Sequence, residues 1–293
     1  MSNSILDLAN AATEYAPDMS VASAGGGGGG DYVPPAKGLA RARLVGYVEY
    51  GVHETSGGAG KPKVNREKVK LIFELSGPAH EPKVLEDGTK LPHRVSIDLN
   101  GSKNYGPLNE KAGLYKAFKR MNYDGSAKHM SQLLGKAFLL EIRHDVKKGS
   151  DGKERTYVSI RDDGGLLVQP PRFVNPLDNT INEVPVDPPI SSLRLFLWNA
   201  APEHQSKMWD SLFIDGEYPE RKNDKGEVTA NAKSKNVLQL EVRSALNFNG
   251  SPIHQLLQTK GVALDLGAQA ETKAAVLAAA TNAADAGDPL AAM

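Results

Sequence analysis

Hydrophobic and polar residues alternate over five stretches between residues 40 and 163, and this alternation predicts five β-strands. The stretches are ARARLVGYVEYGVHE (40–54), EKVKLIFEL (67–75), HRVSIDL (93–99), KAFLLEIRHD (136–145) and RTYVSIRDD (155–163). Each has the period-2 pattern of a strand that is buried on one face. In the first strand the pattern places Tyr47 on the outward face, opposite Leu44 and Val48.

A helix is predicted between the third and fourth strands. In NEKAGLYKAFKRM (109–121), Leu114, Phe118 and Met121 recur at three- and four-residue spacing, and HMSQLLG (129–135) adds a shorter helical turn. Three strands, a helix and two strands are the order of a five-stranded OB barrel. We therefore predict a mainly β (α+β) fold, with an OB-type barrel, a helix between strands 3 and 4, and a C-terminal elaboration of strand and helices.

The segments outside the barrel differ from it in composition. Residues 1–30 lack Lys and Arg and end in six glycines, which predicts a flexible N-terminal arm and linker before a barrel at 31–167. Residues 168–261 begin with proline-rich, extended chain and continue with a strand in SSLRLFLW and helices in PEHQSKMWDSLF and NVLQLEVRSALNF. We expect this segment to pack on the barrel or to mediate self-association. Residues 262–293 are Ala-rich and mildly acidic, which predicts a disordered tail.

The formal net charge of the chain is zero, but the charge is unevenly distributed. Residues 31–170 contain 24 Lys and Arg against 17 Asp and Glu, so this stretch carries +7 and the remainder −7. A basic barrel with acidic extensions can attract a polyanion to one face while the whole protein stays soluble. Chance partitioning of the charges is the alternative explanation, and charge alone does not separate the two.

Two loops rich in Gly and Lys, at 53–67 and 146–155, connect strands 1 to 2 and 4 to 5, the loops with which OB barrels bind oligonucleotides. The candidate phosphate contacts are the basic residues of these loops and of the neighbouring strands: Lys61, Lys63, Arg66, Lys68, Lys70, Arg94, Arg143, Lys147, Lys148, Lys153 and Arg155. Solvated hairpin loops are the structural alternative, but two basic loops at the two expected positions favour binding. On the strands, Glu74, Asp98 and Glu141 are predicted to share a face with three of the cations, so cross-strand ion pairing is a second alternative.

Aromatic side chains supply the other part of a single-strand site, because a base can stack on an aromatic ring whatever its identity. Tyr47 and Tyr157 are predicted to point outward from strands 1 and 5, and they are the candidate stacking residues. A tyrosine in a strand is more often an amphipathic packing residue, so each of the two has a structural alternative.

The sequence offers no positive sign of catalysis. It has no cysteine, its seven histidines do not cluster, and GAGKP in the first loop lacks both the first glycine and the Ser or Thr of a Walker A motif. We therefore predict a protein that is not an enzyme and that uses no metal or cofactor. No apolar stretch is long enough to span a membrane and the N-terminus lacks the pattern of a secretion signal, so we expect a cytoplasmic protein.

Five segments carry a family resemblance: LVGYVEYGVHE, VKLIFELSGP, LNEKAGLYKAFKRMN, LLGKAFLLEIRH and TYVSIRDDGG. Together they resemble the single-stranded DNA-binding proteins encoded by tailed phages. The resemblance implies non-sequence-specific binding of single-stranded DNA in phage replication or recombination, in the host cytoplasm. We further expect partners among replication or recombination proteins, which would bind through the N-terminal arm or the C-terminal tail. Self-association into a homo-oligomer is also expected. The alternative hypothesis is a phage structural or assembly protein that uses an OB-like barrel for protein–protein contacts.

Overall fold

The computed structural model of the chain describes residues 34–57, 60–102, 105–148, 152, 154–222, 226 and 228–260. The predicted N-terminal arm, the predicted C-terminal tail and the candidate Lys153 lie outside these residues. From Pro35 onward the described residues belong to one compact unit. None of the helices in the described ranges is long and apolar enough to cross a membrane.

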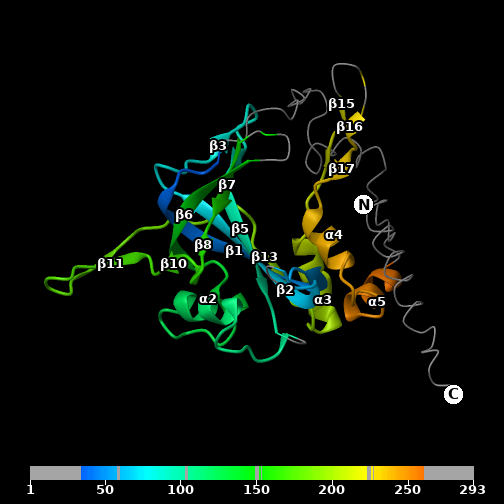
Figure 1. Ribbon diagram of the computed structural model, residues 1–293, viewed down its shortest axis with the longest axis horizontal. Coiled ribbons are helices and arrows are strands. Elements are labelled where there is room, and N and C mark those ends of the chain that lie inside the picture. Colours follow the sequence, from blue (N-terminus) through cyan, green and yellow to red (C-terminus); the bar gives the residue numbers. More distant parts are fainter. Residues whose placement is uncertain are drawn as a thin grey trace, which may run out of the picture. The chain divides into compact units, whose positions relative to one another are not determined.

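The centre of the fold is a seven-stranded sheet (Figure 1). Its strands are β1 (Gly38–Thr55), β2 (Val64–Ser76), β5 (Arg94–Asn100), β6 (Ala137–Lys148), β7 (Glu154–Ser159), β10 (Val168–Gln169) and β13 (Arg194–Phe196). Five of them follow the order β10-β6-β1-β2-β5, while β7 pairs with β6 and β13 pairs with β1. The predicted mainly β class is confirmed. The sheet is not closed into a barrel, because no ladder joins β5 to β7 in the part of the chain that the structure describes.

The long strand β1 organises this sheet. It pairs antiparallel with β2 along most of its length and with β6 through Gly38–Arg43. Farther along, Gly46–Val48 pair in parallel with β13, where β6 no longer runs beside β1. One strand therefore holds together the N-terminal part of the sheet and the C-terminal segment of the chain.

Two irregularities in β1 change which of its side chains face which side. The register with β2 shifts between Leu44 and Gly46 and again between Glu49 and Gly51. A β-bulge adds one residue to a strand, so the side chains after it turn to the opposite face. Tyr47 consequently shares the face of Leu44, and the outward orientation predicted for it is wrong.

The first hydrophobic core lies between one face of the sheet and α2 (Gly113–Met121), and the 3-10 helix η3 (Met130–Leu133) adds to it. Leu44 and Tyr47 contribute to this core from β1. The alternate residues of β2, β5 and β6 that the hydrophobic pattern singles out contribute the rest: Val69, Leu71, Phe73, Leu75, Val95, Ile97, Leu99, Phe138, Leu140 and Ile142.

A second core covers the other face of β1. It is formed by α3 (Pro202–Ser211), α4 (Val237–Arg243) and α5 (Pro252–Thr259), which gather together at a distance from α2 (Figure 1). Trp198 lies in this core, and Val48 reaches it from β1. Because both faces of β1 are buried, the C-terminal segment forms one folded body with the sheet.

The helix boundaries follow local hydrogen bonding. The helix expected from residue 109 begins only at Gly113, because Oδ1 of Asn109 accepts a 2.8 Å hydrogen bond from the backbone N–H of Lys111 and forms a turn instead. Helix α5 was not predicted. Its start has an N-cap signature, since the Ser251 hydroxyl accepts a hydrogen bond from the N–H of His254 and a proline follows the cap.

Within the described residues, five further pairs of short strands form separate two-stranded sheets. They are β3 (Lys83–Val84) with β4 (Lys90–Leu91), β8 (Arg161–Asp162) with β9 (Gly165–Leu166), β11 (Arg172–Val174) with β12 (Ile181–Glu183), β14 (Glu217–Tyr218) with β17 (Lys233–Ser234), and β15 (Arg221–Lys222) with β16 (Val228–Ala230). The β11–β12 hairpin projects away from the rest of the sheet (Figure 1). The sequence interpretation of this stretch as extended chain missed its turn at NPLDNT, where the N–H of Asn175 donates to the carbonyl of Thr180 at 2.9 Å.

Candidate nucleic-acid interface

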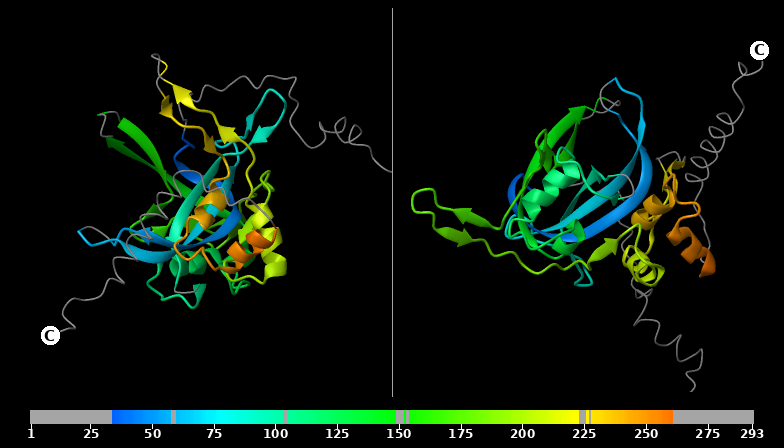
Figure 2. Two further views of the ribbon diagram at one scale, coloured as in Figure 1. Left: turned by 90° about the vertical axis from the view of Figure 1, so that its right-hand side faces the viewer. Right: turned by 90° about the horizontal axis from the view of Figure 1, so that it is seen from below.

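Two hairpins, β1–β2 and β6–β7, extend from the same side of the sheet (Figure 2). In β6 the buried residues end at Ile142, and from Arg143 onward the strand is exposed or half-buried up to Lys148. The hairpin therefore continues beyond the hydrophobic core that anchors its base. The two loops that the sequence predicts to bind an oligonucleotide are the ends of these two hairpins.

One face of the β6–β7 hairpin combines cations with an exposed aromatic ring. The ladder pairs Lys147 with Arg155 and Asp145 with Tyr157. Cross-strand partners and alternate residues of a strand share a face, so Arg143 belongs to the same set. The Nζ atom of Lys147 lies 5.8 Å from the centroid of the Tyr157 ring, and Tyr157 is 46% exposed. An exposed ring beside cations is suited to a stacked base and its phosphate.

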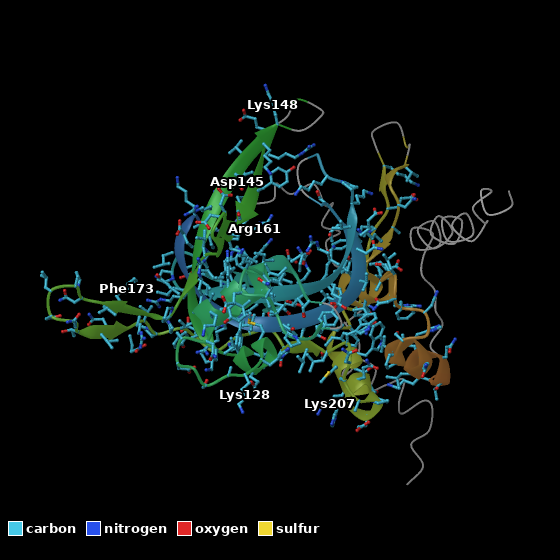
Figure 3. All side chains as sticks on the ribbon, turned by 60° about the horizontal axis from the view of Figure 1, so that its bottom comes forward. Lys128, Asp145, Lys148, Arg161, Phe173 and Lys207 are labelled. Atoms are coloured by element: carbon cyan, nitrogen blue, oxygen red, sulfur yellow. The ribbon has the colours of Figure 1, made fainter. Side chains whose placement is uncertain are left out.

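The remaining cations of this hairpin differ in their surroundings. Lys148 is exposed at the end of β6 (Figure 3). Nε of Arg143 lies 2.9 Å from Oε1 of Glu141, and its Nη1 lies 3.7 Å from Oδ2 of Asp162. The hydrogen bond with Glu141 raises the pKa of Arg143 above its ordinary value, so the guanidinium stays charged while two carboxylates offset its field. Arg143 is therefore a weaker phosphate contact than Lys147 or Lys148.

The β1–β2 hairpin carries Lys61, Lys63 and Arg66, all exposed. Nζ of Lys63 lies 2.6 Å from Oε1 of Glu54, and the two side chains are 73% and 54% exposed. An ion pair this exposed stabilises a protein by only about 0–1 kcal/mol, so a phosphate can displace the carboxylate at little cost. This trio is thus available to a polyanion.

Three of the predicted contacts are not part of the hairpin ends. Lys68 and Lys70 are half-buried on β2, where Nζ of Lys68 lies 3.7 Å from Oε1 of Glu241 on α4. Nζ of Lys70 lies 2.6 Å from Oδ1 of Asp98, its partner in the β2–β5 ladder, as the alternative of cross-strand ion pairing expects. Arg94 is exposed at the start of β5. Lys68 pairs with the other end of that strand, so Arg94 and Lys68 lie apart.

Tyr47 does not lie on the surface. It is 1% exposed in the first core, where its ring meets His129 edge-on at a centroid separation of 5.4 Å. Its hydroxyl donates a 3.0 Å hydrogen bond to Oε1 of Glu49, and burial raises the pKa of Tyr47 so that the hydroxyl keeps its proton. Stacking of a base on Tyr47 is therefore wrong as a prediction, because the bulge before it turns the ring into the core.

Glu49 is the residue whose role the sequence did not predict. It is 3% exposed, and its Oε2 accepts a 2.6 Å hydrogen bond from the backbone N–H of Trp198. Burial raises the pKa of Glu49 to about 7, although the hydrogen bonds from Trp198 and Tyr47 lower it. The only signal for its inward position is the pair of glycines, Gly46 and Gly51, that flank it at the two bulges.

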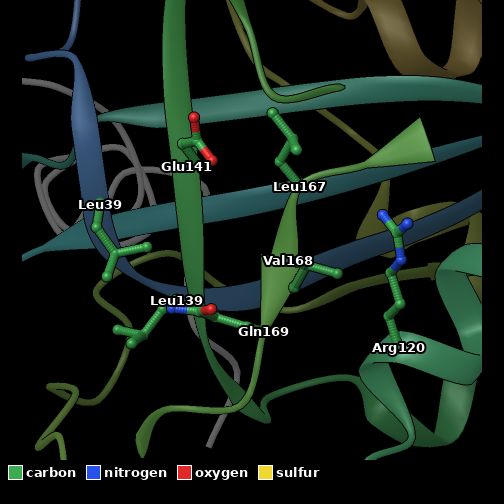
Figure 4. Close-up of a pocket in the computed structure, with 7 residues that line it drawn as sticks. All are labelled: Leu39, Arg120, Leu139, Glu141, Leu167, Val168 and Gln169. Atoms are coloured by element: carbon green, nitrogen blue, oxygen red, sulfur yellow. The ribbon is translucent and has the colours of Figure 1, made fainter. Parts of the chain in front are cut away.

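A hollow of about 140 Å³ opens beside β6 and β10 (Figure 4). Its lining consists of Leu39, Arg120, Leu139, Glu141, Leu167, Val168 and Gln169. We name it the Leu39 hollow, since Leu39 remains 48% exposed there. No periodicity in the sequence could have revealed it, because β1, α2, β6 and the chain around β10 each supply part of the lining.

Within the described residues, no group of three or more His, Asp or Glu side chains is arranged to hold a metal ion. The chemistry that the hairpins do offer is charge, hydrogen-bond donation and one exposed ring. Comparisons with models of protein families, with curated proteins and with solved structures each found no match. Function is therefore inferred from the residues and their geometry.

Proposed function

We propose that this protein binds single-stranded DNA with little sequence preference, through the ends of its β1–β2 and β6–β7 hairpins. One observation carries the proposal: both hairpins extend from the same side of the sheet, both end in exposed cations, and one of them presents Tyr157. The contact residues are Lys61, Lys63, Arg66, Lys147, Lys148, Arg155 and Tyr157. Lys153 belongs to the same loop in sequence but lies outside the described residues.

The ladders support an OB-type core for this site. β1 pairs with both β2 and β6, β2 with β5, and β6 with β7, while α2 lies between β5 and β6 in the chain. These are the pairings of a five-stranded OB barrel apart from the last one, between its third and fifth strands, and OB barrels are often partly open. In that fold the β1–β2 and β6–β7 connections are the loops that hold an oligonucleotide.

The chemistry of the hairpins favours a single strand over a duplex. Stacking on Tyr157 requires a base whose face is open, and each stacked base contributes about 1–3 kcal/mol. Cations that contact phosphates read no base edges, so they add affinity without sequence preference. The resemblance to tailed-phage single-stranded DNA-binding proteins extends the proposal to a role in phage DNA replication or recombination. The proposal includes no catalytic step.

Fluorescence anisotropy tests the proposal, with labelled oligo-dT and a duplex of matched length at 50 mM and 200 mM salt. Six cations on phosphates give a slope of about −4 in log affinity against log salt, so affinity for the single strand should fall by about 300-fold between the two conditions. The duplex should bind much more weakly at both. Equal affinity for duplex and single strand, or none for either, would refute single-strand binding.

A second function, contact with another protein during assembly, is favoured by a different observation. The β11–β12 hairpin exposes large apolar side chains that a nucleic-acid site does not need, among them Phe173 and Leu177. An assembly protein without DNA binding would give no anisotropy change with either probe. The same measurement therefore separates the two functions.

A further inference from the structure

The β11–β12 hairpin, residues 171–184, is an apolar arm. Phe173, Val174 and Ile181 are 50%, 53% and 52% exposed, and Leu177 at the turn is 92% exposed. The arm projects away from the sheet, and Phe173 stands clear of the rest of the chain (Figures 1 and 3). Scattered exposed apolar residues are ordinary, but four on one short projection form a concentrated surface.

The arm is held in shape before it meets any partner. At its tip the N–H of Asn179 donates to the carbonyl of Asn175 at 2.8 Å, and Asn179 adopts the left-handed conformation, with φ 57°, that a tight turn requires. At its root the N–H of Val184 donates to the carbonyl of Pro171 at 2.7 Å. A preformed element loses little conformational entropy on binding.

The arm cannot bury its own apolar residues. Val174 and Ile181 are partners in its ladder and share one face, so Phe173, one position before Val174, lies on the other. An isolated two-stranded hairpin is marginally stable in water, and this one leaves both faces and the tip open to solvent. Covering the Val174 face and the tip requires a partner chain.

The chain itself offers a complementary surface at the root of the arm. The Leu39 hollow includes Val168 and Gln169, which lie immediately before the arm in sequence. Arg120 contributes a guanidinium to the hollow and donates to the neutral carbonyl of Leu166 at 2.6 Å. The carboxylate of Glu141 in the same lining is already paired with Nε of Arg143 at 2.9 Å. The arm tip has the charge opposite to that of Arg120, since the N–H of Thr180 donates to Asp178 and lowers the pKa of that carboxyl below its usual range.

We propose that the apolar arm docks on a second copy of this chain and that Leu177 of each copy enters the Leu39 hollow of the other. Two arms lying antiparallel about a two-fold axis bring the tip of each to the root of its partner, where the hollow lies. The six residues from Arg172 to Leu177 span roughly 15–20 Å, which sets the offset between the two roots. The Val174 and Ile181 faces then cover each other near the axis. The contact between Leu177 of one copy and the Leu39 hollow of the other is made twice, as in any isologous dimer.

Single-cysteine cross-linking tests this geometry, because the natural chain contains no cysteine. Leu177→Cys and Leu39→Cys are made separately in the full-length protein and treated with a short bis-maleimide, alone and mixed. The mixture should give a covalent dimer, whereas each variant alone should give far less, because like residues lie at opposite ends of the interface. Equal cross-linking in the mixture and in Leu177→Cys alone would instead place the two tips together and overturn the docking in the hollow.

Sedimentation velocity over a concentration series tests whether the arm causes association. The wild-type protein should form dimers, and Val174→Ser with Leu177→Ser should weaken dimerisation by about 30-fold or more, the effect of losing a central apolar anchor. Val84→Ser with Leu91→Ser is the matched control, since these residues are 59% and 43% exposed on the β3–β4 hairpin. The control should leave the dimer unchanged.

The outcomes are separable from those of DNA binding. A wild-type protein that stays monomeric up to about 100 µM, or an arm variant that dimerises like wild type, overturns the proposal. An oligo-dT too short for two copies should bind the arm variant as it binds wild type, because the arm lies outside the proposed DNA contacts. Loss of that binding together with dimerisation would show that the arm serves the DNA site, and self-association through it would be rejected.

Discussion

The backbone N–H of Trp198 donates a 2.6 Å hydrogen bond to the Glu49 carboxyl, which is 3% exposed. The two residues are 149 positions apart in the chain. The other carboxyl oxygen of Glu49 accepts from Tyr47, which packs in the first core, whereas Trp198 packs in the second. One buried carboxyl thus joins the sheet to the C-terminal segment, and its protonation affects how firmly they are joined.

The stability of the protein is therefore predicted to depend on the ionisation of Glu49. Burial raises the pKa of Glu49 from 4.5 to about 7 in the folded protein, so the folded state prefers the neutral carboxyl. The stabilisation that Glu49 gives the folded state is fully present below pH 4.5 and is lost as the pH rises through 7. The total loss in the free energy of unfolding is about 3 kcal/mol. Urea unfolding at half-unit steps from pH 5 to 8 measures it as a falling free energy of unfolding.

Glu49→Gln isolates this effect from other titrating groups. The amide oxygen can accept from Trp198 while the amide NH2 donates to the Tyr47 hydroxyl, so the hydrogen bonds are retained without a charge. The difference between the wild-type and variant free energies of unfolding, plotted against pH, should fall between pH 5 and 8. Glu54→Gln, an exposed position on the same strand, should leave the wild-type slope intact. A slope that survives Glu49→Gln would show that another group is responsible.

Gly51 is predicted to be irreplaceable for packing as well as for backbone conformation. Its φ is +86°, and an added Cβ would lie 2.5 Å from Cζ3 of Trp198 and 2.7 Å from Cβ of Ala245. Gly51→Ala should lower the free energy of unfolding by about 2–4 kcal/mol, from overpacking and a left-handed backbone together. Gly88→Ala is the control, because φ there is +80° with nothing within 4 Å, and it should cost about 1 kcal/mol. Equal losses at both glycines would mean that the packing against Trp198 is unimportant.

The sequence predicted strands best where only one face is buried. In β5, Val95 and Ile97 alternate with exposed neighbours, so the hydrophobic pattern correctly predicts which side chains are buried. In β1 the same reasoning failed for Tyr47, because a run of residues is buried on both faces and bulges shift the register twice. Alternation carries no information once a second core covers the outer face. Only the two glycines at positions 46 and 51, one at each shift, indicate the change.

The candidate site likewise has a part that the sequence predicts and a part that it does not. The exposed cations at the hairpin ends, such as Lys61 and Lys147, were predictable because loop position and composition are local properties. That Lys68 instead faces Glu241 depends on α4 folding back over β2, a contact between distant parts of the chain that no local pattern encodes. The apolar arm had a readable turn, NPLDNT, but the prolines around it obscured the hairpin.

Removing either group of loop cations should reduce the salt dependence of DNA binding. Lys61, Lys63 and Arg66 form one trio, and Lys147, Lys148 and Arg155 form the other. Each phosphate contact on a single strand contributes about 0.7 to the slope of log affinity against log salt, so an Ala triple variant should flatten the slope by up to about 2 units. The fold should be unaffected, because exposed substitutions usually change stability by within about 0.5 kcal/mol. Anisotropy with oligo-dT at four salt concentrations measures the slope.

Two exposed lysines far from the hairpin ends provide the control for charge itself. Lys128 and Lys207 lie at the opposite end of the view from Lys148 (Figure 3). Replacing both with Ala removes positive charge without touching the proposed interface, so the slope should stay within about 0.3 of wild type. If the control flattens the slope as much per residue as the trios do, net charge rather than the hairpins governs binding.

Tyr157 is predicted to act by stacking, which releases no counterions. Tyr157→Ala should weaken oligo-dT binding by about 1–3 kcal/mol at every salt concentration and leave the slope unchanged, while Tyr157→Phe keeps most of the affinity. Tyr218 gives a matched comparison, because it is 53% exposed and has Nζ of Lys235 at 5.6 Å from its ring centroid, yet belongs to β14. Tyr218→Ala should bind as wild type. If the two tyrosines prove equally dispensable, the bases are held elsewhere and the hairpins contact only the backbone.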